Sequence, residues 1–288
     1  MKYLQLIRPK QWVKQGFVFV PLLSLGSQFS LVDFWQGLRA MVIFTGIASF
    51  VYIYNDFSDL EYDKKDLFRS LRPLASGQVK KKNAILLSMG LLASSLVACF
   101  FLSNSSASSL GLILVYLLAN MAYSSLNLKR HNILGISLVG IGFPIRFAFG
   151  CSFVGIPYSY WAITMLMLLA LFMLSIKRYQ LTLRNAPSEN DSDHEFWLIA
   201  AITFAAFFSA SYVGFVSSPT TQGVWGSTTL LISSIPVALG IVRFIELGTD
   251  KKRISAGDAT EAVVKDFPSL VLSLIYVSIM FVGNISIH

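Results

Sequence analysis

The chain has 288 residues, of which 55% are hydrophobic and only 13% are charged. Soluble domains usually have about 25% charged residues, so this composition excludes an ordinary soluble protein and favours a helical membrane bundle. The formal net charge of +8 would suit nucleic acid as a partner, but the distribution of the basic residues excludes it.

The N-terminal segment is basic and aromatic and contains Arg8, Trp12 and Lys14. It predicts an interfacial segment that enters a first membrane span at about residues 12–29. We expect this span to be irregular, because Pro21 removes a backbone hydrogen bond from a helix. Lys14 lies inside the span, and we expect its side chain to face a cavity in the bundle.

A stripe of acids ends the second apolar run, which covers about residues 34–55. Asp56, Asp59, Asp63 and Asp66 are spaced so that a helix would place all four carboxylates on one face. Like charges on one face at the end of a span are unfavourable unless a cation binds there. Carboxylate oxygens suit Mg²⁺, and Mg²⁺ suits a phosphate-bearing substrate.

Further apolar runs make nine spans in all. They lie at about 84–102, 109–126, 133–152, 159–178, 196–216, 226–246 and 268–286. Each is long enough to cross about 30 Å of hydrocarbon as a helix. Lipid cannot satisfy exposed backbone groups, so helices are the expected structure. The sequence therefore predicts an all-α integral membrane protein that forms a single membrane domain over residues 1–288.

The basic residues predict the orientation of these spans. With the N-terminus in the cytoplasm, every Lys and Arg except Arg39 and Arg146 falls in a cytoplasmic segment or at the adjoining span ends. We therefore expect a multi-pass protein of the inner (cytoplasmic) membrane, with its C-terminus outside. The long loops at about 57–83 and 243–267 predict caps over a site on the cytoplasmic side.

Cationic and tyrosine side chains are the candidates for binding an anionic substrate. Arg146 lies in the middle of a span, where a charge needs a phosphate or an acid as its partner. The run at 80–82 is predicted to contact lipid headgroups instead. The other candidates are Arg69, Arg72, Tyr123, Lys129, Lys177 and Arg178.

The acidic stripe resembles a motif of the UbiA-type prenyltransferase superfamily. Asn55, Asp56, Asp59 and Asp63 match N-D-x-x-D-x-x-x-D, and residues 69–74 resemble the arginine-containing loop of that superfamily. The resemblance implies nine helices around a cavity that opens to the cytoplasmic side. It also implies that these four residues bind Mg²⁺ on a diphosphate and that the three aspartates are catalytic.

Four shorter stretches resemble the decaprenyl-phosphate phosphoribosyltransferase branch of the superfamily. The most discriminating is residues 8–14, which look like R-P-x-Q-W-x-K; the others are residues 123–129, residues 143–146 and the Lys177–Arg178 pair. This likeness implies that phosphoribosyl pyrophosphate is the donor and a polyprenyl phosphate the acceptor. By the same analogy, the product would serve the synthesis of cell-envelope glycan precursors.

Two departures bear on the substrate. Prenyltransferases that act on aromatic acceptors usually carry a second aspartate-rich motif after the sixth helix, and residues 177–182 have no acid. A glutamate that often follows the K-R pair in the phosphoribosyl branch is also missing. The alternatives are transfer from a prenyl diphosphate to an aromatic or other small acceptor, and a transporter with a cytoplasmic cation site. Isoprenoid length and oligomeric state are not fixed by the sequence.

Overall fold

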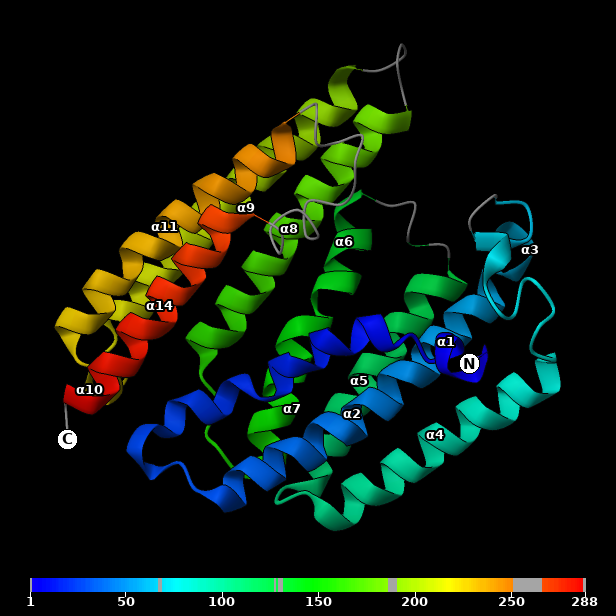
Figure 1. Ribbon diagram of the computed structural model, residues 1–288, viewed down its shortest axis with the longest axis horizontal. Helices are drawn as coiled ribbons and strands as arrows, with labels where there is room; N and C mark the ends of the chain where they lie inside the picture. The colour runs from blue at the N-terminus through cyan, green and yellow to red at the C-terminus, as the bar shows by residue number, and fades with distance from the viewer. Residues whose placement is uncertain are drawn as a thin grey trace. The chain divides into compact units, whose positions relative to one another are not determined.

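The computed structural model is all-helical over the residues that it describes, which are 2–66, 69–126, 128, 132–185, 191–250 and 266–286 (Figure 1). The helices group into two compact units, Met1–Tyr158 and Ser159–His288. The predicted single membrane domain concerns how these units sit together and stays a prediction.

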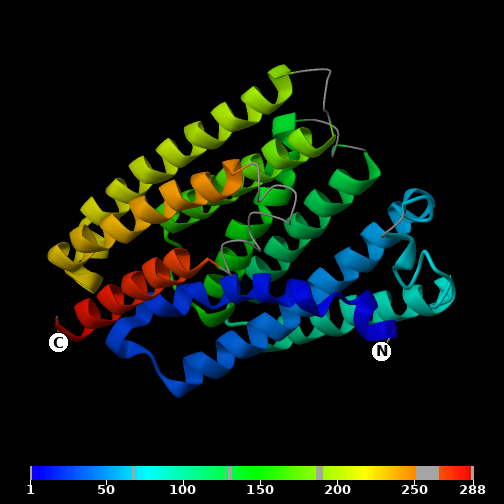
Figure 2. The ribbon, with the colours of Figure 1, turned by 45° about the horizontal axis from the view of Figure 1, so that its top comes forward.

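The first unit begins with a short helix, α1 (Lys2–Leu6), followed by two 3₁₀ helices, η1 (Pro9–Val18) and η2 (Val20–Gln28). The predicted first span at 12–29 is therefore helical and irregular, but its hydrogen bonding is of the 3₁₀ type. A 3₁₀ helix rises about 2 Å per residue, so these two helices reach further than an α-helix of equal length. In Figure 2 this segment lies alongside α2 and α7, which it contacts.

The helix that organises the first unit is α2 (Leu31–Ser58). It starts at a capping box, in which the Ser30 hydroxyl accepts from the Asp33 amide and the Asp33 carboxylate accepts from the Ser30 amide. Its middle is buried, and Phe44, Ile47 and Val51 contribute to the main apolar core. Consequently α2 runs from a solvated cap, through the core, to the acidic stripe at its C-terminal end.

The rest of the first unit packs around α2. Its elements are α3 (Leu60–Asp63), η3 (Arg69–Leu71), α4 (Lys81–Leu102), α5 (Ser106–Ser125), α6 (Asn132–Gly140) and α7 (Gly142–Val154). Helix α4 lies beside α2 (Figure 1), and Gly46 permits this approach, because a Cβ there would meet the Ser95 hydroxyl at 2.2 Å. Helices α6 and α7 break at Ile141 and together form one apolar stretch.

The second unit is a bundle of α8 (Tyr160–Asn185), α9 (Asp191–Ser217), α10 (Pro219–Trp225), α11 (Ser227–Thr249) and α14 (Phe267–Ser286). Phe172, Ile176, Ala201 and Phe244 form one of its apolar clusters. Most of the predicted cap at 243–267 lies outside the described residues. The start of that predicted loop is the end of α11, which continues to Thr249.

Seven described stretches are long and apolar enough to cross a membrane, and α14 carries a shorter apolar stretch. This confirms the predicted all-α, multi-pass membrane class. The count of nine spans and a cavity that opens to the cytoplasm stay predictions.

Candidate active site

The C-terminal end of α2 and the short helix α3 that follows it place two buried carboxylates on one arginine. Asp56 is 3% exposed and Asp63 is 1% exposed. Nη1 of Arg72 donates to Asp63 Oδ2 at 2.5 Å and to Asp56 Oδ1 at 3.3 Å. Buried carboxylates are stable only with such charge-assisted partners, so Arg72 supports both of them at once.

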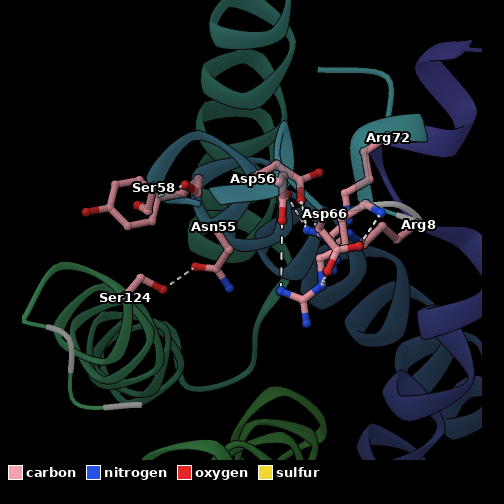
Figure 3. Close-up of polar contacts among 10 residues, drawn as sticks. Arg8, Asn55, Asp56, Ser58, Asp66, Arg72 and Ser124 are labelled. Carbon is pink, nitrogen blue, oxygen red and sulfur yellow. Dashed lines mark hydrogen bonds and ion pairs between the residues drawn. The ribbon is translucent and has the colours of Figure 1, made fainter. Parts of the chain in front are cut away.

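Arg8 supplies a second guanidinium to Asp56 from 48 positions earlier in the sequence. Its Nη2 donates to Asp56 Oδ1, and Figure 3 shows Arg8 and Arg72 converging on this carboxylate. The Arg8 backbone is left-handed, with φ 51°, which is uncommon for a residue that carries a Cβ. A strained backbone of this kind persists when surrounding contacts stabilise it. Arg8 is the residue immediately before η1. We call Arg8, Asp56, Asp63 and Arg72 the acidic cluster.

The predicted single stripe of four acids is interrupted. Helix α2 ends at Ser58, Asp59 caps it, and α3 carries the chain only as far as Asp63. The helical bond pattern survives this break, since the Asp63 amide donates to the Asp59 carbonyl at 2.8 Å. Asp66 lies beyond α3, where its carboxylate accepts from the Arg69 amide at 2.9 Å. The four acids therefore do not share one continuous helix.

Two further predicted residues lie beside the acidic cluster. The Arg69 side chain is 3.9 Å from Asp63 Oδ1 and 4.0 Å from Asp66 Oδ2. The Asn55 amide oxygen accepts from the hydroxyl of Ser124, on α5, at 2.7 Å (Figure 3). Tyr123, the neighbour of Ser124, is half-buried. The end of α5 thus holds the Asn55 side chain, one residue before Asp56 on α2.

The acidic cluster fits a divalent cation in its chemistry. Within the described part of the chain, no three acidic, histidine or cysteine side chains are already grouped to hold a metal. Instead, one nitrogen of Arg72 bridges the oxygens of Asp56 and Asp63, so a cationic group already lies where these carboxylates meet. Asp63 Oδ1 is buried and accepts no hydrogen bond. A buried oxygen of this kind is a ready ligand for a hard cation.

A second polar group surrounds Arg146 in the middle of the unit. Its Nε donates to Gln15 Oε1 at 2.8 Å, its Nη1 to the Gly142 carbonyl at 2.6 Å, and its Nη2 to the Tyr116 hydroxyl at 3.1 Å. Arg146 is 5% exposed, and the aromatic rings of Phe44, Tyr116 and Phe143 lie within 6 Å of its guanidinium carbon. We call Gln15, Tyr116, Gly142 and Arg146 the arginine cluster.

The remaining predicted residues are placed less directly. Lys14 is exposed, although its neighbour Gln15 is fully buried. Lys129 lies outside the described residues. Lys177 is exposed and Arg178 half-buried on α8. That helix continues to Asn185, so it extends beyond the predicted span at 159–178, which ends at this pair. Polar residues sustain α8 beyond its apolar part.

Four contacts of the two clusters and their neighbours were not predicted from the sequence. Arg8 was noticed only as part of a motif, and Gln15, Tyr116 and Ser124 were not proposed for the site. Each pairs with a residue far along the chain, and Gln15 and Arg146 are 131 positions apart. A buried Gln next to a mid-span arginine could have been suspected only with the helix pairing known.

Comparison with known proteins supplies a family and a fold. A family model described as the UbiA prenyltransferase family matches residues 17–260. A structure of a UbiA homolog from Archaeoglobus fulgidus bound to DMAPP and Mg²⁺ superposes with a TM-score of 0.71 and 15% identity, and the match covers 99% of each chain. At that identity, the structural likeness concerns the fold alone.

Two similar sequences are decaprenyl-phosphate phosphoribosyltransferases. The one from Mycolicibacterium smegmatis is 33% identical over 177 residues, which is 60% of this chain and 54% of the relative. The chain therefore matches little more than half the length of that relative. The one from Corynebacterium glutamicum is 27% identical over 292 residues, which covers 96% of this chain and 85% of the relative.

Proposed function

The chain belongs to the UbiA prenyltransferase family, and from this premise we propose that it transfers a 5-phosphoribosyl group from phosphoribosyl pyrophosphate to a polyprenyl phosphate, with Mg²⁺ as cofactor. Pyrophosphate would be released. The choice of donor and acceptor is supported by the two phosphoribosyltransferase relatives and by residues 8–14. We further propose that the product enters the synthesis of cell-envelope glycan precursors.

The observation that carries the proposal is the shared arginine of Asp56 and Asp63. Arg72 bonds both carboxylates through a single nitrogen, and Arg8 bonds Asp56 as well. The cluster thus holds two buried anions and two cations that are only 27% and 29% exposed. A metal diphosphate has the same alternation of charge, so it could replace each internal ion pair with an equivalent one.

The chemistry assigns distinct tasks to these side chains. Asp56, Asp59 and Asp63, with Asn55, would hold Mg²⁺, which when bound supplies charge neutralisation to the leaving diphosphate. Arg8, Arg69 and Arg72 would donate to diphosphate oxygens once they are released from the carboxylates.

The reaction itself needs little further machinery. The transition state at the ribose C1 should resemble an oxocarbenium ion, as in glycosyl transfer generally. The acceptor phosphate is already ionised near neutral pH, so its oxygen can attack C1 without a general base. Inversion at C1 would then give a β-linked phosphoribosyl lipid.

Transfer from a prenyl diphosphate is the competing activity. It is favoured by the presence of DMAPP and Mg²⁺ in the Archaeoglobus structure. The absence of any acid between residues 177 and 182 argues against it, because the second acidic motif of aromatic prenyltransferases would fall there. The same proposed Mg²⁺ ligands would bind the diphosphate of either donor, so the donor must be tested directly.

The test uses purified full-length protein in detergent with radiolabelled phosphoribosyl pyrophosphate, a polyprenyl phosphate and Mg²⁺. The proposal predicts a labelled lipid that forms with Mg²⁺ and is lost on chelation. Absence of labelled lipid from an otherwise folded protein would overturn the proposal. Omission of the polyprenyl phosphate is the matched control, because it removes the acceptor without changing the metal or the donor.

A further inference from the structure

Arg146 is a buried positive charge that has no carboxylate partner among the described residues. It contacts Gln15, Tyr116 and Gly142, and each of these contacts is neutral. The residue lies well inside the apolar stretch Asn132–Val154, where an uncompensated charge is expensive. Cation–π contacts with nearby rings offset part of this cost, but they do not neutralise the charge.

The arginine cluster also has more donors than acceptors. A guanidinium has five N–H groups, and three contacts leave part of this donor capacity unused. The Nε2 of Gln15 is buried and has no hydrogen-bond partner, although Gln15 is 0% exposed. Buried donors are normally satisfied, so an amide nitrogen without a normal hydrogen bond, beside a guanidinium without a carboxylate partner among the described residues, points to a missing acceptor.

The orientation of the Gln15 amide is fixed by its neighbour. The guanidinium Nε can only donate, so it requires Oε1 on its side, and Nε2 must point away. Gly142 allows the guanidinium to lie against its own helix, since a Cβ there would be 2.8 Å from Arg146 Nη1. Four elements, η1, α2, α5 and α7, meet at this cluster. The donors are therefore held in place by the fold.

We propose that Gln15, Tyr116 and Arg146 form a binding site for a phosphomonoester dianion, separate from the acidic cluster. A dianion would accept from the unused guanidinium N–H groups and from Gln15 Nε2, and the Tyr116 hydroxyl can donate as well. Its charge would neutralise Arg146. This inference rests on the proposed function for its ligand, because both proposed substrates carry a phosphomonoester: the 5-phosphate of the donor and the phosphate of the lipid acceptor.

Tyr52 places this site next to the acidic cluster. It lies one turn before Asp56 on α2, and the Arg8 guanidinium carbon is 5.7 Å from the centre of its ring. Tyr52 is also within electrostatic range of Arg146, and the Gln15 side-chain amide faces its hydroxyl without making a hydrogen bond of normal geometry. A substrate that carries two phosphate groups could therefore contact both clusters.

The first experiment measures binding of inorganic phosphate to purified full-length protein by the shift in its thermal unfolding midpoint. Gln15→Glu places a carboxylate beside Arg146, so it supplies the missing negative charge from within the protein. We expect the variant to unfold no earlier than wild type without phosphate, and to bind phosphate at least about tenfold more weakly. The matched control is Gln28→Glu, the same change at an exposed position.

Equal stabilisation of wild type and Gln15→Glu by phosphate would overturn the inference, as would a wild type that phosphate does not stabilise. If Gln15→Glu does not fold, Tyr116→Phe serves instead, because it keeps the ring in the core and removes only the hydroxyl. It should weaken phosphate binding by about threefold to tenfold. Unchanged binding in Tyr116→Phe would then overturn the inference.

The second experiment distinguishes the two sources of the phosphomonoester. In the labelled-lipid assay, Gln15→Glu (or Tyr116→Phe in its place) is compared with wild type. An increase of about tenfold in the variant's KM for phosphoribosyl pyrophosphate alone would assign the site to the donor 5-phosphate. The same increase for polyprenyl phosphate alone would assign it to the acceptor. Unchanged KM values for both would overturn the inference. If wild type forms no labelled lipid, the proposed function fails, while the phosphate titration still decides whether the arginine cluster binds the anion.

Discussion

The acidic cluster and the arginine cluster lie in the same unit but differ in their charge balance. The acidic cluster balances two carboxylates with two guanidiniums, and its arginines remain partly exposed. The arginine cluster has one guanidinium, no carboxylate among the described residues, and is almost fully buried. Balanced charges can exchange partners with little net change in electrostatic free energy, whereas an unbalanced buried charge needs a partner from a bound ligand.

The difference in charge balance indicates which kind of ligand each cluster can bind. The acidic cluster can accept a cation between its carboxylates if its arginines turn to an anion, which is the pattern of a metal diphosphate. The arginine cluster can accept only an anion. Mutations in the acidic cluster should therefore affect the binding of a metal diphosphate, whereas mutations in the arginine cluster should affect the binding of an anion alone.

The largest effect is expected from Asp56→Asn, which unbalances the acidic cluster. The amide removes the charge that Arg8 and Arg72 share, and with it a proposed metal ligand. Turnover should fall on the order of a thousandfold in the labelled-lipid assay. Asp59→Asn should act in the same direction, because Asp59 belongs to the same proposed ligand set.

The matched control is Glu61→Gln, which removes an exposed acid from the same stretch. Glu61 pairs with Lys64 at 2.8 Å, and this hydrogen bond lowers the pKa of its carboxyl. Since Glu61 lies outside the cluster, its variant should keep turnover within about twofold of wild type. Full activity in a folded Asp56→Asn protein would contradict the metal assignment.

Arg72→Gln should have the next largest effect. It removes the nitrogen that bridges Asp56 and Asp63, and among the described residues it leaves Asp56 with Arg8 and Asp63 with only Arg69, at 3.9 Å. We expect turnover to fall about a hundredfold. Arg72→Lys keeps the charge but not the planar fork, so it should recover only part of this loss. Complete rescue by lysine would show that only charge matters at this position.

Gly142→Ala tests the packing of the arginine cluster. The added methyl group would lie 2.8 Å from Arg146 Nη1, so the guanidinium must shift. Overpacking of this kind should lower the free energy of unfolding by about 2 kcal/mol, read as a lower thermal midpoint in detergent. Gly111→Ala on α5 is the control, since nothing lies within 4 Å of its added Cβ. A neutral Gly142→Ala would contradict the close fit of the cluster.

Ser124→Ala should have the smallest effect. It removes the hydrogen bond to the Asn55 amide oxygen, which costs about 1 kcal/mol and should reduce turnover only several-fold. The comparison is Ser94→Ala on α4, whose hydroxyl bonds to the carbonyl of Leu91 in its own helix. Equal turnover in the two variants would remove Ser124 from the support of the site.

Local patterns predicted most of the helices and part of the site. Hydropathy located the long spans, and the spacing of Asp56, Asp59 and Asp63 predicted an anionic site at the end of α2. The prediction was wrong where local signals were ambiguous. Helix α2 ends before Asp59 and α3 ends at Asp63, so the four acids do not share one helix, and α8 continues to Asn185, beyond the predicted span end at residue 178.

Contacts between distant residues could not be read from the sequence. The pairing of Arg8 with Asp56, and of Gln15 with Arg146, depends on how η1 packs against α2 and α7. The sequence around a glutamine in an apolar segment does not show whether its side chain packs in the core or binds a ligand. The burial of Gln15 and its orphan amide therefore emerge only from the packed structure.

A competition between donors tests the proposed donor most directly. Purified protein with Mg²⁺ is given phosphoribosyl pyrophosphate and a prenyl diphosphate together, with a polyprenyl phosphate and an aromatic acceptor, and the products are identified by mass spectrometry. We predict phosphoribosylated polyprenyl phosphate and no prenylated aromatic compound. A prenylated aromatic product without the phosphoribosyl lipid would contradict the proposed donor.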